Sequence, residues 1–154
     1  MDDLRVLIIA DDPLARAGLA ALLSDQPDCI VVGQVASDSD LSTNLEAFRP
    51  DVLLWDLGWD TTVTVESLAD LPEGSPPLVA LLPDETHTIE TWTAGALGLL
   101  LRNAGAPSLV AALGAVASGI AAVYPQLVTA MVSARGMPQP PTAGVLTPRE
   151  LEVL

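Results

Sequence analysis

The chain has 154 residues and is 50% hydrophobic, enough for one domain with a real core and too short for two ordinary domains. Its formal net charge is −14 and its basic residues are all arginine, a balance that repels phosphate backbones and argues against direct nucleic-acid binding. No signal-peptide pattern opens the chain, and the single cysteine, Cys29, excludes an internal disulfide framework, so we expect a reducing, cytoplasmic setting.

Apolar runs alternate with helical patterns through the first half of the chain. Residues 5–10 form an uninterrupted apolar run, which is typical of a strand covered on both faces. Asp12 and Pro13 then supply an N-cap and a first helical residue. The predicted elements are a strand at 5–10, a helix at 13–24, a strand at 30–35, a helix at 41–48 and a strand at 51–55, which Asp56 follows directly.

The same alternation continues through the second half, where Gly95 suits a left-handed helix C-cap. The predicted elements are a helix at 62–70, a strand at 78–82, a helix at 86–94, a strand at 98–101 and a helix at 107–119. Strands that alternate with helices of about ten residues form right-handed βαβ units. The sequence therefore predicts an α/β fold, doubly wound, with a five-stranded parallel sheet and helices on both faces.

Beyond that domain, which we assign to residues 1–122, the pattern changes. Residues 123–135 are expected to hold one more helical segment, and the proline-rich residues 136–145 are expected to form a semi-rigid linker. In residues 146–154, Thr147, Pro148 and Glu150 form a capping box that opens an amphipathic helix. We expect this helix to continue in a longer protein.

Residues 103–134 carry no charge, which raises the question of a membrane span. Pro107 and Pro125 bracket an apolar run that is shorter than the ~20 residues a spanning helix needs, and the run is rich in Gly and Ala. We therefore expect no membrane association.

Three carboxylates fall at the carboxyl ends of predicted strands, where ligands bind in such sheets. Asp11 and Asp12 follow the first strand, and Asp56 follows the third. Together they would repel one another, and bound Mg²⁺ would relieve that repulsion. Asp56 could then act as a nucleophile that forms an acyl phosphate. Taken singly, Asp12 could merely cap a helix and Asp56 merely end a strand, but the combination favours a site.

Four segments resemble a known family. Residues 6–13, 51–57 and 95–102 resemble receiver domains of the NarL/FixJ type, and residues 146–150 resemble the opening of a LuxR-type helix-turn-helix. The resemblance implies the flavodoxin-like receiver fold with strand order 2-1-3-4-5. It also implies a two-component response regulator that controls an attached DNA-binding domain. A histidine kinase or a small phosphodonor would be its partner.

By the same resemblance, Asp56 is the phosphoacceptor, and Asp11, Asp12, Asp56 and the backbone carbonyl of Gly58 hold Mg²⁺. Arg102 stands where the family has a lysine, and it keeps a cation whose planar fork can bind phosphate bidentately.

Other positions depart from the family pattern. At the switch positions, Leu82 and Pro83 replace a Ser or Thr, and Leu99 replaces an aromatic residue; Trp59-Asp60 replaces Met-Pro. These departures favour an alternative, a phosphorylation-independent pseudo-receiver that acts through dimer, ligand or protein contacts and leaves the metal site empty.

The chain is not expected to be an enzyme beyond self-phosphorylation and autodephosphorylation. A Mg²⁺-dependent phosphohydrolase with an aspartyl nucleophile is disfavoured, because Gly58 stands where those enzymes have a second aspartate. For Trp55 and Trp59 we favour a packing role, and for His87 a solvated surface position.

The last helix of the domain has two distinct faces. One face is an apolar stripe suited to the sheet, formed by Leu109, Leu113, Val116 and Ile120. The other face is small and uncharged, which is unusual for an exposed surface. We expect this face to form a symmetric homodimer interface through Ala111, Gly114, Ala115 and Ser118.

Overall fold

A computed structural model of the chain describes residues 3–134, apart from the side chains of residues 61–64 and 134. The predicted linker at 136–145 and the predicted helix start at 146–154 lie outside the described residues.

The centre of the fold is a parallel sheet in the order β2-β1-β3-β4-β5-β6. Its strands are β1 (Leu4–Ala10), β2 (Cys29–Val35), β3 (Val52–Asp56), β4 (Leu78–Leu82), β5 (Gly98–Leu101) and β6 (Ala122–Val123). The parallel α/β architecture is confirmed, but the prediction of five strands is wrong, because β6 pairs with β5 through Gly98↔Ala122 and Leu99↔Val123. A strand of two residues is too short to show any periodic pattern in the sequence.

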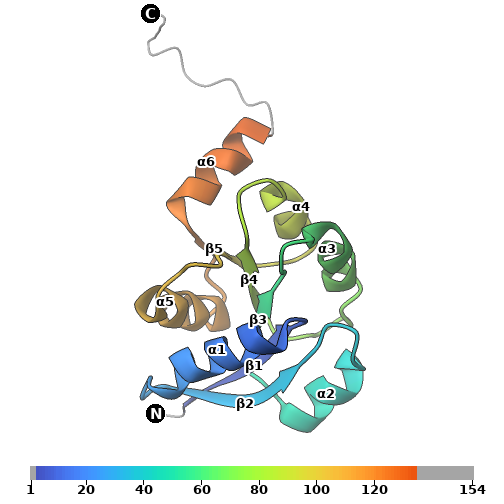
Figure 1. Ribbon diagram of the computed structural model, residues 1–154, viewed down its shortest axis with the longest axis vertical. Coiled ribbons are helices and arrows are strands. Elements are labelled where there is room, and N and C mark those ends of the chain that lie inside the picture. The colour runs from blue at the N-terminus through green and yellow to red at the C-terminus, as the bar shows by residue number, and fades with distance from the viewer. Residues whose placement is uncertain (1–2, 135–154) are drawn as a thin grey trace, which may run out of the picture.

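Helices cover both faces of the sheet (Figure 1). They are α1 (Pro13–Ser24), α2 (Leu41–Phe48), α3 (Thr61–Ala69), α4 (Thr88–Thr93), α5 (Ala106–Ala117) and α6 (Pro125–Ala134). One hydrophobic cluster joins α1 and α5 to the sheet, and a second joins residues of α2, α3, α4 and α6 to the opposite face. Strands β3 and β4 are buried at every position, as expected of strands covered on both sides.

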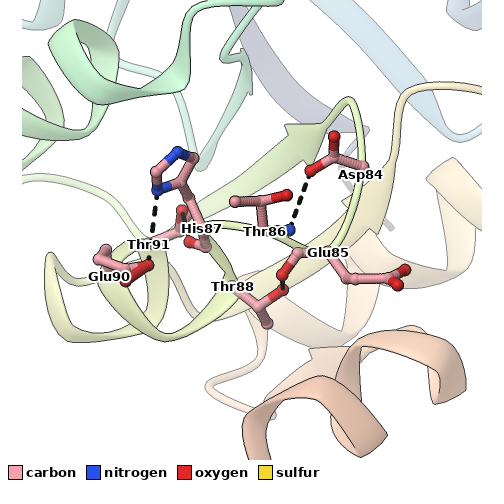
Figure 2. Close-up of polar contacts among 7 residues, drawn as sticks. All are labelled: Asp84, Glu85, Thr86, His87, Thr88, Glu90 and Thr91. Atoms are coloured by element: carbon pink, nitrogen blue, oxygen red, sulfur yellow. Dashed lines mark hydrogen bonds and ion pairs between the residues drawn. The ribbon is translucent and has the colours of Figure 1, made fainter. Parts of the chain in front are cut away.

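Local sequence explains where several helices begin. Asp12 is the N-cap of α1, and its Oδ1 accepts a hydrogen bond from the backbone N–H of Leu14 at 2.9 Å. Helix α4 begins at Thr88 rather than at residue 86, because Asp84 first accepts a hydrogen bond from the N–H of Thr86 at 2.9 Å and forms a turn (Figure 2). Turn chemistry therefore shortened a helix that periodicity alone predicted as longer.

Helix α5 ends earlier than predicted. Its last residue is Ala117, and Gly119 has a φ of 87°, a left-handed conformation that stops the helix. Leu109, Leu113 and Val116 are buried against the sheet as expected, but Ile120 lies beyond the helix and is 60% exposed. The prediction that Ile120 belongs to the buried stripe is wrong for this reason.

No helix within residues 3–134 is both long and apolar enough to cross a membrane.

Candidate functional site

The strand order brings the predicted carboxylates to one edge of the sheet. The chain leaves β1 toward β2 and returns past β1 to β3, so the connections diverge between these two adjacent strands. Ala10 at the end of β1 pairs with Asp56 at the end of β3. Divergence of this kind opens a crevice at the carboxyl ends of the strands, which is the usual ligand position in such sheets.

Asp56 occupies the centre of this crevice. It is only 5% exposed, and Leu81 of β4 pairs with it on the other side. Its Oδ1 accepts a hydrogen bond from the backbone N–H of Gly58 at 3.0 Å. A carboxylate this deeply buried needs a compensating charge or a full set of hydrogen bonds.

Arg102, just after β5, provides that charge. Its Nε lies 2.8 Å from Oδ1 of Asp56, and its Nη2 donates to Oδ2 at 3.0 Å. The pair is therefore bidentate, the strongest geometry for an arginine and a carboxylate. The Arg102 guanidinium carbon also lies 4.6 Å from the centre of the Trp59 ring, within cation–π range.

Asp11 and Asp12 reach the same crevice but have partners of their own. Asp11 Oδ1 accepts two hydrogen bonds from Ser37 in the loop after β2, from the backbone N–H at 2.8 Å and from Oγ at 2.6 Å. Asp12 caps α1 through its bond with Leu14. Chain groups thus bind both oxygens of Asp56 but only one oxygen each of Asp11 and Asp12.

The predicted site residues line one cavity. Its volume is about 410 Å³, and its walls are Asp11, Asp12, Asp56, Leu57, Gly58, Trp59, Asp60 and Arg102. A second cavity of about 590 Å³ extends from Asp56, Trp59 and Arg102 toward α1. The sequence therefore placed these residues in one region, although they come from three separate loops.

The donor set does not form a metal centre in this conformation. Within the described residues, no group of three or more His, Cys, Asp or Glu side chains lies close enough together to hold a metal ion. Arg102 engages both oxygens of Asp56, and Ser37 engages Asp11. The Mg²⁺ ligand set of Asp11, Asp12, Asp56 and Gly58 consequently stays a prediction.

The predicted switch positions lie next to the site. Leu82 and Leu99 are completely buried in the hydrophobic cluster on the α3 and α4 face of the sheet. Pro83 is half-buried and starts the loop that leads to α4. Two aliphatic side chains packed in this way offer no hydroxyl to a ligand and no exposed aromatic ring.

The loop after Pro83 is organised by its own hydrogen bonds, as Figure 2 shows. Thr88 Oγ1 donates to the Glu85 carbonyl at 2.7 Å, and His87 Nδ1 lies 3.7 Å from Glu90. The hydrogen bond from Thr86 lowers the pKa of Asp84 below its ordinary value. His87 is half-buried, so the prediction of a solvated surface residue is correct only in part.

Sequence reasoning missed three contacts around the site. Ser37 belongs to a loop with no motif, and Arg16 of α1 donates to the Ala10 carbonyl at 2.7 Å, which ties α1 to the end of β1. Trp59, for which a packing role was favoured, is instead 80% exposed and lies over Arg102. The Ser37 and Trp59 contacts join residues distant in sequence, and no local sequence pattern predicts any of the three contacts.

Curated relatives and a solved structure are similar to this chain. No family model matches the chain. It is 29% identical to the transcriptional regulatory protein DegU of Brevibacillus brevis over 80% of this chain and 54% of DegU. It is 26% identical to the response regulator protein VraR of Staphylococcus epidermidis over 98% of this chain and 74% of VraR. The chain thus spans about half of the first relative and about three quarters of the second.

A solved structure is similar to nearly the whole chain. The response regulator ChrA of a heme-sensing two-component system superposes with a TM-score of 0.71 at 28% sequence identity. The match covers 99% of this chain and 73% of ChrA.

Proposed function

The homologues of this chain are NarL/LuxR-family response regulators, and from that premise we propose that it is a receiver domain that accepts a phosphoryl group on Asp56 and controls an attached DNA-binding domain. The observation that carries the proposal is the position of Asp56 at the end of β3, within a cavity that it shares with Asp11, Asp12 and Arg102.

The proposed chemistry is a single displacement at phosphorus. An Asp56 carboxylate oxygen attacks the phosphorus of a phosphodonor, a phosphorus–oxygen bond forms, and the bond to the leaving group breaks as that group departs with its electron pair. The Arg102 fork, bidentate on Asp56 in the free state, is suited to move onto the oxygens of the bound phosphoryl group. The donor would be a histidine kinase or a small acyl phosphate.

Incubation with acetyl phosphate and Mg²⁺, followed by intact-mass measurement, tests this proposal. We expect the added mass of one phosphoryl group, and we expect it to disappear in Asp56→Asn. The matched control is Asp60→Asn, which removes another carboxylate of the same cavity and should leave the adduct in place. Absence of the adduct from the unmodified chain would remove phosphotransfer from the account.

A specific observation favours the second candidate, a phosphorylation-independent pseudo-receiver. Arg102 already binds both oxygens of Asp56, and the switch positions Leu82 and Leu99 are buried aliphatic residues. Titration with Mg²⁺ monitored by tryptophan fluorescence discriminates the candidates, because Trp59 borders the cavity. A saturable response supports the metal-dependent receiver, and no response supports the pseudo-receiver.

The partner surface belongs to the same proposal. Among the predicted interface residues, Ala111 on α5 and Ser118 just after it are exposed, and Gly114 and Ala115 are half-buried. This small, uncharged face is suited to a symmetric dimer. Light scattering should show a dimer at micromolar concentration, and Ala111→Glu should convert it to a monomer. A monomeric unmodified chain at high micromolar concentration would contradict the interface.

A further inference from the structure

Trp59 is an unusual residue to find in solvent. Its side chain is 80% exposed, although indole is among the most hydrophobic groups in proteins. Within the described contacts its ring lies over the Arg102 guanidinium, 4.6 Å from ring centre to guanidinium carbon. The Trp59 ring therefore contacts Arg102, the counter-ion of the predicted phosphoacceptor Asp56.

Arg102 pairs with both oxygens of Asp56 in the free state. Nε and Nη2 bind the two oxygens of Asp56 at 2.8 and 3.0 Å. The Arg102 side chain keeps 19% of its surface exposed, against 4% for Asp56, so solvent reaches the pair from the arginine side. A ring stacked on the guanidinium stabilises it there and restricts its rotamers.

A clamped Arg102 has a consequence for cation binding. A divalent ion would need an Asp56 oxygen, and both are engaged by a guanidinium of fixed geometry. The cation and the guanidinium thus compete for the Asp56 carboxylate. A contact that holds Arg102 in its pair with Asp56 therefore lowers the affinity of Asp56 for a divalent cation.

We propose that Trp59 is a positioning residue that holds Arg102 in its bidentate pair with Asp56 and thereby lowers the affinity of the cavity for divalent cations. The inference concerns the free protein, and it stands whether or not Asp56 is later phosphorylated.

The test compares Trp59→Leu, which removes the aromatic face, with Trp59→Phe, which keeps one. Two quantities are measured on the full chain. These are Mg²⁺ affinity, measured by calorimetry, and the rate at which the Arg102 Nε–H exchanges with solvent, measured by NMR. In Trp59→Leu we expect Mg²⁺ to bind about two- to fivefold more tightly, the factor that a surface cation–π contact supplies, and Nε–H exchange to accelerate. Trp59→Phe should restore most of both values.

The control is Val128→Ser, which alters another exposed apolar side chain, on α6 and outside both site cavities. It should change neither quantity. A thermal unfolding midpoint within a few degrees of the unmodified chain shows that each variant is folded.

A double-mutant cycle with Arg102→Lys completes the test. The lysine keeps the charge but loses the planar fork, so Trp59→Leu should have no further effect on Mg²⁺ affinity in that background. Additive effects, or an unchanged affinity and exchange rate in Trp59→Leu, would overturn the proposal. If Trp59→Leu and Arg102→Lys are coupled in their effect on Mg²⁺ affinity but no phosphoryl adduct forms, the role of Trp59 is upheld and the proposed phosphotransfer is contradicted. If the adduct forms but the two substitutions are not coupled, the phosphotransfer is upheld and the role of Trp59 is contradicted.

Discussion

Ser37 and Asp11 illustrate how single residues restrain the site. Two hydrogen bonds from Ser37 hold one oxygen of the Asp11 carboxylate, which otherwise faces the cavity. Ser37→Ala removes the hydroxyl bond and keeps the backbone bond. We expect a loss of about 1 kcal/mol in the free energy of unfolding, because the bond is exposed but involves a charged acceptor.

Urea denaturation of Ser37→Ala measures this loss, and Ser42→Ala, an exposed serine of α2, is the control. Mg²⁺ titration of the same variant should show tighter binding, since only one of the two hydrogen bonds that hold Asp11 Oδ1 remains. A variant with weaker Mg²⁺ binding than the unmodified chain would contradict this interpretation.

The individual site residues were predictable to different degrees. Asp11, Asp12 and Asp56 could be placed together because parallel strands end at one edge of a sheet, and Arg102 was indicated by a resemblance that includes its position after the fifth strand. Trp59 and Ser37 act across the cavity through contacts that depend on loop conformations. No periodicity encodes those conformations, so these two roles required the structure.

At the scale of elements, β5 packs so closely that it requires glycine. A Cβ on Gly98 would lie 2.8 Å from Val79 Cγ2, 3.2 Å from Val79 Cα and 3.0 Å from Val116 Cγ2. Gly98→Ala should therefore destabilise the fold by about 1–3 kcal/mol through overpacking. The matched control is Gly18→Ala on α1, where a Cβ meets nothing within 4 Å and should stabilise the helix by up to about 1 kcal/mol. Urea midpoints that move in the same direction for both variants would contradict this account.

Helix α2 depends on a titratable cap. Asp40 accepts hydrogen bonds from the N–H and Oγ1 of Thr43 at 3.2 and 2.8 Å, and these bonds lower the pKa of Asp40. Because the folded pKa is below the unfolded value, the stabilisation is present above the unfolded pKa and is lost as pH falls through the folded pKa. Asp40→Asn keeps a cap that does not titrate.

Urea denaturation across an acid pH series checks this sign. The unmodified chain should lose stability relative to Asp40→Asn as pH falls through the acidic range. A stability difference that does not change with pH would show that the Asp40 cap makes no titratable contribution.

Helix α6 packs as part of the folded domain. Leu127 is completely buried, and Gln126 Nε2 donates to Glu85 Oε2 at 2.6 Å, so α6 is tied to the loop before α4. Leu127→Ala should cost about 2–5 kcal/mol, whereas Val128→Ala, at an exposed position, should cost less than about 0.5 kcal/mol. Equal thermal shifts for the two variants would mean that α6 contributes little to the core.

Some element boundaries could not be derived from sequence. The strands β1, β3 and β4 could be predicted from their apolar runs, because strands buried on both faces need continuous hydrophobic residues. In contrast, β6 has two residues, and the ends of α4 and α5 depend on turn geometry at Asp84 and Gly119. Two residues cannot repeat a pattern, and periodicity does not define where a helix starts or stops within a turn.

On the scale of the whole molecule, charge and topology indicate that signal reception and DNA contact belong to different parts of the protein. A chain with a net charge of −14 is poorly suited to contact DNA, whereas its central cavity concentrates carboxylates around one arginine. We therefore propose that residues 3–134 receive the signal and that DNA contact belongs to an attached domain. The α/β class followed from the alternation of strands and helices, and the helical segment predicted at 123–135 corresponds to α6, but the sixth strand emerged only from the structure.

The central claim is that Asp56 accepts a phosphoryl group, and chemical trapping tests it most directly. The chain is incubated with acetyl phosphate and Mg²⁺, the acyl phosphate is reduced with borohydride, and the reduced residue is located by peptide mass mapping. The account predicts one modified residue, Asp56, and loss of the modification in Asp56→Asn. Modification at Asp11 or Asp12 instead, or no modification in the unmodified chain, would contradict it.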